Sequence, residues 1–383
     1  MLSQRNKLVK VLITGADGFV GKNLQLHLAE RKDVQVLCFT RSNDVAQLLA
    51  MLEGVDFVFH LAGVNRPKDP QEFATGNADL TQALCDAVCN VADATGKKVP
   101  IICTSSTQAG RDNPYGQSKL VAEGALQAAA LSHGIPVHVF RLPNVFGKWC
   151  KPNYNSAVAT FCHNISRGLP IQVNDPASHV TLVYVDDVIA RFMQLMDGAD
   201  ATTNADGFAT VAPQYSTTVG ELAQKIQTFK DSRTTLMTER VGTGLVRALY
   251  ATYVSYLPVE EFTYTVPQYS DPRGVFAEML KTPDGGQFSF FTAHPGITRG
   301  GHYHHSKTEK FLVIKGQARF KFRHMQTGQI HELCTSGEIS TIVETVPGWT
   351  HDITNIGADE MVVMLWANEV FDRERPDTFA CPV

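Results

Sequence analysis

Residues 8–21 read LVKVLITGADGFVG, a short apolar run followed directly by a segment with a glycine at every third position. The run Leu8 to Thr14 is typical of a buried strand, and Lys22 to Glu30 continues with helical spacing. A strand, a glycine turn and a helix form the first unit of a dinucleotide-binding sheet, in which a pyrophosphate lies at the start of the helix. The spacing is G-x-x-G-x-x-G rather than G-x-G-x-x-G, so the interpretation rests on the strand–turn–helix context.

The same alternation of strands and helices continues for more than a hundred residues. It predicts a parallel, doubly wound α/β sheet, whose ligands lie at the carboxyl ends of the strands. Five residues far apart in sequence fall on that predicted edge: Gly15, Arg41, Ala62, Ser106 and Asn144. We expect further strands at 34–39, 56–63, 99–105 and 137–141, and helices at 77–91 and 115–130.

Composition excludes several classes of protein. The chain has 383 residues and a formal net charge of −4, without a long basic or acidic block, so we expect no nucleic-acid partner and no anionic membrane surface. The first ten residues do not resemble a signal peptide, and no apolar run is long enough to span a bilayer. The eight cysteines form no C-x-x-C pair, which favours reduced thiols in a cytoplasmic protein.

The residue after the second strand bears on the choice of cofactor. Thr40-Arg41-Ser42 stands where an NAD enzyme usually places an acidic residue for the ribose 2′-hydroxyl. An arginine there suits a 2′-phosphate and therefore favours NADPH. The alternative is a solvated arginine at a strand end.

A possible proton donor lies in residues 103–119, CTSSTQAGRDNPYGQSK. Tyr115 and Lys119 are four apart, so on a helix they share one face. A nearby ammonium lowers the pKa of a phenol, which can then deliver a proton to a carbonyl oxygen while a hydride reaches the carbon. An ordinary surface helix is the alternative for this pair taken alone.

Residues 8 to about 245 resemble an extended short-chain dehydrogenase/reductase of the nucleotide-sugar-modifying group. The resemblance implies that Tyr115 is the acid/base, that Lys119 binds the nicotinamide ribose, and that Ser106 hydrogen-bonds the substrate carbonyl, with Ser105 and Thr107 as alternatives. Asn144 would contact the sugar nucleotide. The motifs are TGADGFVG (14–21), HLAG (60–63), Ser105-Ser106, YGQSK (115–119), RLPNVFG (141–147) and YVDDV (184–188). The expected cofactor-binding residues are Gly15, Asp17, Gly18, Phe19, Val20, Gly21, Arg41, Leu61, Ala62, Tyr115 and Lys119.

The pattern changes from about residue 262 onward, after a helical connector at 245–257. Short alternating runs separated by glycine and proline turns predict a small antiparallel barrel or sandwich. We therefore expect a reductase domain at 1–250, with its substrate-binding part at about 148–245, and an all-β domain at 258–383.

The second domain contains a possible metal site. His302 and His304 are two apart on an expected strand, Glu309 returns on the next segment, and His351 comes later. Three imidazoles and a carboxylate are ligands that zinc or another first-row divalent ion accepts. The alternative is a set of surface histidines.

The spacing from Gly296 through these residues to Gly316 resembles the first motif of the cupin family. The second motif departs from the family pattern, because Pro347 and Gly348 are adjacent. That departure leaves His351 open as a ligand, and His305 is an alternative to His304. The resemblance implies a metal-binding cupin barrel.

Together the two halves resemble the bifunctional bacterial capsule and O-antigen enzymes on the route to UDP-N-acetyl-L-fucosamine. That resemblance implies that the cupin domain epimerises C3 of a UDP-2-acetamido-2,6-dideoxy-hexos-4-ulose. The reductase domain would then reduce C4 with NADPH to give UDP-2-acetamido-2,6-dideoxy-L-talose. It also implies a homodimer, with zinc as the most common metal.

The residues leave the epimerase base open. His305, His294 and Lys310 are candidates, and Tyr303 could return the proton. Three rival functions remain: a plain reductase with a structural, dimerising cupin domain, an NADP-binding sensor and a 4,6-dehydratase. A sensor would usually lack the Tyr–Lys pair, and a dehydratase usually needs an Asp-Glu pair where Thr107-Gln108 stand.

Overall fold

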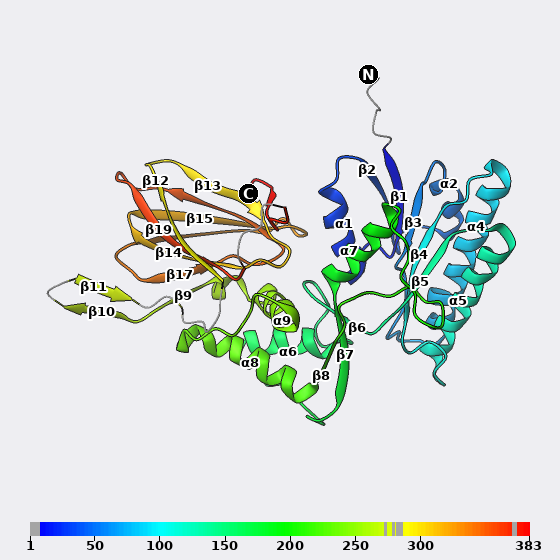
Figure 1. Cartoon of the computed structure of the whole chain (residues 1–383), viewed down its shortest axis with the longest axis horizontal. Coiled ribbons are helices and arrows are strands. Elements are labelled where there is room, and N and C mark those ends of the chain that lie inside the picture. The colour runs from blue at the N-terminus through cyan, green and yellow to red at the C-terminus, as the bar shows by residue number, and fades with distance from the viewer. Residues whose placement is uncertain (1–7, 272–273, 278–279, 281–285, 370–373) are drawn as a thin grey trace, which may run out of the picture. The chain divides into compact units, whose positions relative to one another are not determined.

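A computed structural model describes residues 8–271, 274–277, 280, 286–369 and 374–383. Its first sheet is parallel, as expected, with strand order β2-β1-β3-β4-β5 (Figure 1). The α/β class of the first part is therefore confirmed, and four of the five strands end within one residue of the expected position. The strands are β1 (Val9–Thr14), β2 (Val34–Phe39), β3 (Phe57–His60), β4 (Ile101–Ser106) and β5 (Val137–Leu142).

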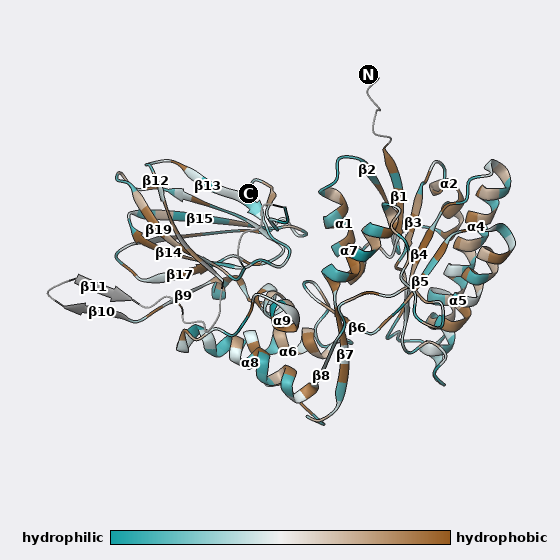
Figure 2. Ribbon diagram, viewed as in Figure 1, coloured by the Kyte–Doolittle hydropathy of each residue, from teal (hydrophilic) through white to brown (hydrophobic). Residues whose placement is uncertain are grey.

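Helices cover both faces of this sheet (Figure 1). Neighbouring strand residues point to opposite faces: Val58 belongs to the core shared with α2, α4 and α5, whereas the ring of Phe59 lies 6.2 Å from that of Phe192 on α7. Hydrophobic residues run along β1 (Figure 2). The helices of this part are α1 (Phe19–Ala29), α2 (Leu48–Met51), α3 (Gln71–Phe73), α4 (Leu80–Thr95), α5 (Pro114–His133) and α7 (Val185–Met196), with short helices η1 (Val45–Gln47) and η2 (Ala74–Asp79).

The turn between β1 and α1 requires glycine at two positions. Gly15 has φ +69°, and a Cβ there would lie 2.6 Å from the backbone of Ala62. A Cβ on Gly21 would lie 2.4 Å from the backbone oxygen of Gly15. The glycines therefore let the first turn pack directly against the end of β3.

The middle of the chain adds a three-stranded sheet in the order β6-β7-β8 and three longer helices. The helical connector expected near residue 250 is α9. The elements are β6 (Asn144–Phe146), β7 (His179–Tyr184), β8 (Tyr215–Thr218), α6 (Ala157–Ser166), α8 (Val219–Thr235), α9 (Gly244–Ser255) and η3 (Val259–Phe262).

The C-terminal part is antiparallel, with two five-stranded sheets, β12-β19-β14-β17-β9 and β16-β15-β18-β13-β20, and a β10-β11 pair. These sheets are consistent with the expected cupin barrel. The strands are β9 (Thr263–Thr265), β10 (Gln268–Asp271), β11 (Gly274–Ala277), β12 (Gln287–Ala293), β13 (Thr298–Tyr303), β14 (Glu309–Lys315), β15 (Gln317–His324), β16 (Ile330–Ser336), β17 (Thr341–Glu344), β18 (Trp349–Asn355), β19 (Met361–Ala367) and β20 (Phe379–Ala380).

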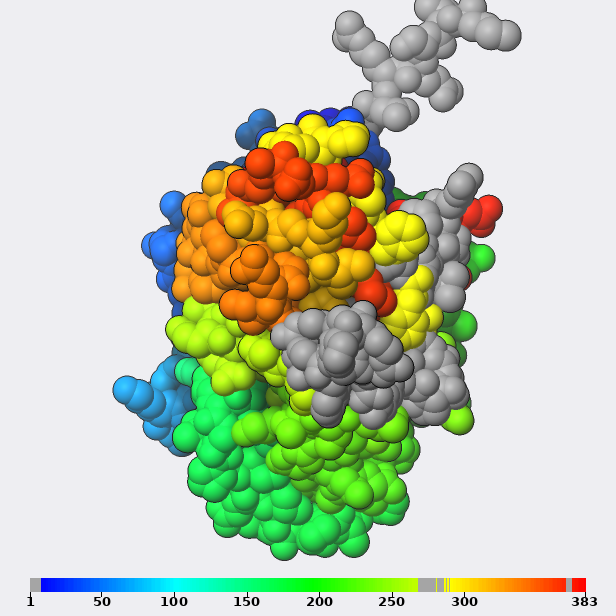
Figure 3. Space-filling view, turned by 90° about the vertical axis from the view of Figure 1, so that its left-hand side faces the viewer, coloured from blue at the N-terminus to red at the C-terminus, as the bar shows by residue number. Residues whose placement is uncertain are grey.

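The chain forms two compact units, each built from two segments. The first contains residues 1–145 and 181–215, and the second contains residues 146–180 and 216–383. Within the second unit, the part of the chain drawn in green lies against the part drawn in yellow to red (Figure 3), and Tyr250 of α9 donates to Glu344 of β17. No helix in the described part of the chain is long and apolar enough to cross a membrane.

Candidate functional site

The start of α1 is suited to an anionic ligand. Its N-cap is Gly18, none of the side chains that the structure describes caps it, and its first turn carries no acidic residue. The free N–H groups and the positive end of the helix dipole are therefore available to a pyrophosphate. Asp17, Phe19, Val20 and Gly21 belong to the same turn and helix start, so the structure brings the predicted phosphate-binding residues together.

The neighbouring strand ends carry the other predicted cofactor residues. Gly15 packs against the backbone of Leu61 and Ala62, directly after β3. Arg41 follows β2 and is exposed. These positions fit a dinucleotide lying across the carboxyl edge of the sheet.

Tyr115 and Lys119 occupy the first turns of α5, whose N-cap Asn113 accepts a hydrogen bond from the Gly116 amide. The buried Lys119 ammonium donates to the Thr104 backbone oxygen at 3.2 Å. Burial lowers the pKa of Lys119. Burial also raises the pKa of Tyr115, and a hydrogen bond with Ser106 offsets part of that increase. The expected lowering of the Tyr115 pKa by Lys119 stays a prediction.

The three hydroxyl candidates near Tyr115 have different environments. Ser106 interacts with Tyr115. The buried Ser105 hydroxyl instead donates to Glu123 at 2.5 Å, and Glu123 also accepts two bonds from Arg141. Thr107 lines a pocket of about 420 Å³ together with Arg141 and Leu142. The geometry therefore favours Ser106 as the partner of Tyr115.

Asn77 is a site neighbour that sequence reasoning missed. It lies in the π-helical turn η2, and its amide nitrogen donates to the Ser118 hydroxyl at 2.9 Å. A Cβ on Gly63 would lie 2.9 Å from Lys119 Nζ and 3.1 Å from Asn77 Oδ1, so both polar groups reach the same small space. The sequence predicted only the start of a helix here, and no local pattern marks the π turn.

Asn144, the predicted substrate residue, is exposed on β6. Its amide nitrogen donates to the backbone oxygen of Thr181 on β7 at 3.1 Å. It begins β6 of the three-stranded sheet, and only Pro143 separates it from the end of β5 at Leu142.

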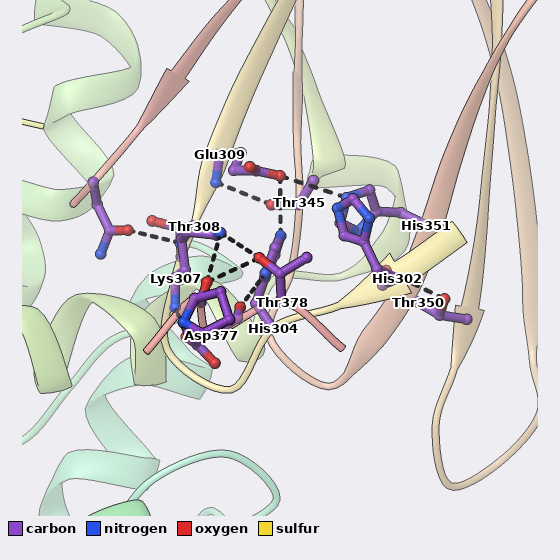
Figure 4. Close-up of polar contacts among 12 residues, drawn as sticks. His302, His304, Lys307, Thr308, Glu309, Thr345, Thr350, His351, Asp377 and Thr378 are labelled. Carbon is purple, nitrogen blue, oxygen red and sulfur yellow. Dashed lines mark hydrogen bonds and ion pairs between the residues drawn. The ribbon is translucent and has the colours of Figure 1, made fainter. Parts of the chain in front are cut away.

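The four predicted metal ligands converge in the C-terminal sheets. His302, His304, Glu309 and His351 each offer one ligand atom, and these atoms all lie within 4.8 Å of one another. His302 and His351 are register partners on β13 and β18. His304 lies just past the end of β13 rather than on it, because the strand ends at Tyr303. Figure 4 shows Glu309 in contact with both His304 and His351.

The polar atoms of this cluster fit a divalent ion. Glu309 Oε2 lies 3.0 Å from His304 Nε2 and 3.5 Å from His351 Nε2. Ligands about 2.0–2.1 Å from one ion are themselves roughly 2.8–3.4 Å apart at right-angled to tetrahedral angles. Among the described residues, neither ring nitrogen of the buried His351 has a hydrogen-bond partner. An ion bound in the cluster would give one of these two nitrogens a partner.

The protonation states also suit metal binding. Burial and the neighbouring imidazoles lower the pKa of His302 to about 4, and burial lowers the pKa of His351 despite Glu309. Burial alone would raise the pKa of Glu309, but His304 and His351 hold it well below its ordinary value. Neutral imidazoles and a carboxylate are the forms that bind a cation.

The candidate bases lie in different surroundings. His305 does not join the four-residue cluster; its ring packs edge-on against Tyr303 and Phe379, with centroids 5.5 and 5.0 Å away. His294 is exposed. Lys310 follows Glu309 on β14 and therefore points to the opposite face of the sheet. Its ammonium donates to Glu344 and Tyr264.

Comparison with known proteins assigns families to both parts of the chain. Residues 11–208 match the NAD dependent epimerase/dehydratase family, and residues 269–379 match the polysaccharide biosynthesis C-terminal domain. The chain is 62% identical over 375 residues to a Pseudomonas aeruginosa protein described as UDP-2-acetamido-2,6-beta-L-arabino-hexul-4-ose reductase. That alignment covers 98% of this chain and 99% of the relative.

Solved structures similar to the whole chain share both parts. One is the capsular polysaccharide assembling protein CapF from Staphylococcus aureus, with 41% identity and a TM-score of 0.65, covering 98% of this chain and all of that one. Another is CapF with the inhibitor 3-isopropenyl-tropolone, with 38% identity, a TM-score of 0.62 and the same coverage.

Proposed function

The chain belongs to the NAD dependent epimerase/dehydratase family, and on that basis we propose that it is an oxidoreductase of capsule or O-antigen nucleotide-sugar biosynthesis. It reduces the C4 ketone of a UDP-2-acetamido-2,6-dideoxy-hexos-4-ulose with NADPH to UDP-2-acetamido-2,6-dideoxy-L-talose. The observation that carries the proposal is 62% identity along nearly the full chain to a protein described as a reductase of such a ketose. The enzyme is a cytoplasmic homodimer.

The residues around Tyr115 have the chemistry that this reduction needs. The bound cofactor supplies a hydride to the carbonyl carbon. Tyr115 gives its phenolic proton to the carbonyl oxygen, so the ketone becomes an alcohol. Ser106, beside Tyr115, holds the same oxygen in place. Lys119 would bind the nicotinamide ribose and would favour the phenolate that remains.

A second activity is supported by the cluster around Glu309. We propose that the cupin part epimerises C3 of the same substrate before reduction, with His302, His304, Glu309 and His351 holding a divalent ion, most commonly zinc. Such an ion supplies Lewis-acid polarisation of the ketone.

The two activities belong together chemically. A ketone at C4 acidifies the proton at C3, so a base can remove that proton and the enolate can be reprotonated from the other face. Reduction at C4 removes the acidifying group and traps the epimerised sugar. The order epimerisation, then reduction, is therefore the productive one.

Two variants, one in each proposed site, distinguish the reductase activity from the epimerase activity. Tyr115→Phe is expected to abolish NADPH oxidation but to retain exchange of the C3 proton with deuterated water, followed by proton NMR of the ketose. Glu309→Gln is expected to lose exchange and to retain binding of NADPH. Loss of both NADPH oxidation and C3 proton exchange in folded Tyr115→Phe would contradict the two-site proposal. Undiminished exchange in Glu309→Gln would assign the cupin part a structural, dimerising role.

A further inference from the structure

The C-terminal residues 374–383 are bonded to the strand that carries His302. β20 pairs antiparallel with β13, in the register His302 with Ala380 and Tyr303 with Phe379. The Cys381 amide donates to the Gly301 oxygen at 2.7 Å. These ten residues are therefore part of the wall of the candidate metal site.

Within this segment, the side chain of Asp377 accepts several hydrogen bonds from residues 305–307. Its carboxylate accepts hydrogen bonds from the backbone amides of His305, Ser306 and Lys307 at 2.9, 2.9 and 2.6 Å, and from the Ser306 hydroxyl at 3.1 Å. These amides form the loop between two candidate ligands, His304 and Glu309 (Figure 4). The Asp377 carboxylate therefore fixes the path of that loop.

The Asp377 main chain acts on His304 itself. The Nδ1 atom of His304 lies 2.6 Å from the backbone oxygen of Asp377. A carbonyl oxygen only accepts hydrogen bonds, so Nδ1 is the nitrogen that carries a proton. The Nε2 atom lies 3.0 Å from Glu309, so it is the nitrogen that faces the cluster and can offer its lone pair to an ion.

The backbone of Asp377 is bent to make this contact. Its φ is +38°, in the left-handed region that few residues other than glycine adopt and in which aspartate is better tolerated than most. The same residue thus presents its carboxylate to the loop and its carbonyl to the His304 ring. Neighbouring contacts hold the segment in place, including Lys307 Nζ to the Pro376 oxygen at 3.1 Å.

We propose that Asp377 is a positioning residue of the metal centre: its carboxylate fixes the loop 305–307, and its carbonyl selects the His304 tautomer that binds metal through Nε2. This inference rests on the proposed metal centre. Partners of this kind orient metal-bound histidines, and their loss typically weakens metal affinity about ten- to a hundredfold.

The test compares Asp377→Ala and Asp377→Asn with Asp359→Ala, a matched loss of an exposed aspartate in the same unit. Metal-free proteins are titrated with Zn²⁺ against a chromophoric chelator, and with Co²⁺ to record the absorption spectrum of the site. Asp377→Ala should bind Zn²⁺ about ten- to a hundredfold more weakly and give an altered Co²⁺ spectrum. Asp377→Asn keeps one acceptor oxygen and should be intermediate, whereas Asp359→Ala should match the wild type.

A second readout reports the tautomer without metal. Long-range ¹⁵N–¹H correlation of histidine rings, assigned with His304→Gln, should show a protonated Nδ1 at His304 in the wild type. The preference should weaken in Asp377→Ala, because the variant keeps the backbone carbonyl but loses the carboxylate that holds it against the ring. Wild-type affinity in Asp377→Ala, or an unchanged tautomer, would overturn the positioning role alone. A wild-type protein that binds neither ion would overturn the metal centre, and the positioning role with it.

Discussion

The ammonium nitrogen of Lys310 lies 2.5 Å from Oε1 of Glu344, and both side chains are buried. Lys310 also donates to Tyr264 at 2.9 Å, and Arg233 lies 3.3 Å from the other oxygen of Glu344. Burial alone would lower the pKa of Lys310, but Glu344 holds it well above the ordinary value. A lysine that stays protonated is a poor base, so this pair belongs to the structure of the second unit rather than to the epimerase chemistry.

The pair makes a prediction about stability. Glu344→Leu leaves the buried ammonium of Lys310 without its carboxylate and leaves Arg233 with the more distant Glu261, 3.9 Å away. It should lower the free energy of unfolding of the second unit by about 3–5 kcal/mol. Lys310→Met leaves Glu344 with Arg233 and should cost less. The double variant should recover part of the loss. Urea unfolding followed by tryptophan fluorescence measures all three, and equal losses for the two single variants would contradict this account.

The Glu344 carboxylate is also expected to make the stability of the folded protein depend on pH. Burial raises the pKa of Glu344, but Lys310 and Arg233 bring it below the ordinary value of 4.5. A depressed pKa in the folded state contributes stability above about pH 4.5, and that stability is lost as pH falls through the folded value. Unfolding midpoints measured from pH 7 to pH 3 should therefore fall more steeply below pH 4.5 in the wild type than in Glu344→Gln. Parallel curves would place the acid-sensitive groups elsewhere.

The serines at the end of β4 predict different defects. Ser106→Ala removes the hydroxyl beside Tyr115 and should lower kcat for C4 reduction about 10²- to 10³-fold, as for other lost donors to a reacting oxygen. Ser105→Ala removes the bond to Glu123 and should cost about 1 kcal/mol of stability, with kcat within a few-fold of the wild type. Steady-state kinetics and thermal unfolding of both variants check this. The reverse pattern would make Ser105 the catalytic hydroxyl.

The cofactor preference can be tested at Arg41. If its guanidinium binds the 2′-phosphate, Arg41→Ala should raise KM for NADPH about ten- to a hundredfold, the range expected for charged hydrogen bonds, and leave KM for NADH nearly unchanged. Lys32→Ala removes another exposed positive charge from the same unit and serves as the control. Equal changes in both KM values for Arg41→Ala would argue against a 2′-phosphate contact.

Local spacing explains which features could be predicted from the sequence. Tyr115 and Lys119 share a helix, and His302 lies on a strand with Glu309 at the start of the next one, as expected. In both cases the signal lies within a few neighbouring residues. The two serines could not be separated, because their difference depends on which one faces Glu123 on α5.

Long-range contacts explain what the sequence did not predict. His351 departs from the family spacing, yet β-sheet register brings it opposite His302. Asp377 contacts His304 across 73 residues of sequence, and nothing near residue 377 marks a role in a metal site. Lys310 looked like a candidate base until the fold supplied Glu344, 34 positions away, as its partner.

The division of each unit into two segments has a consequence for synthesis on the ribosome. The chain passes between the units after residues 145, 180 and 215. Residues 1–145 therefore emerge before the stretch 181–215 that completes their unit. Residues 146–180 likewise emerge before residues 216–383, which form the rest of the second unit. Since domains generally fold as units during translation, the nascent chain holds two incomplete cores at once. A chaperone that shields residues 146–180 until β8 and α8 emerge would protect this enzyme more than one whose domains follow each other in sequence.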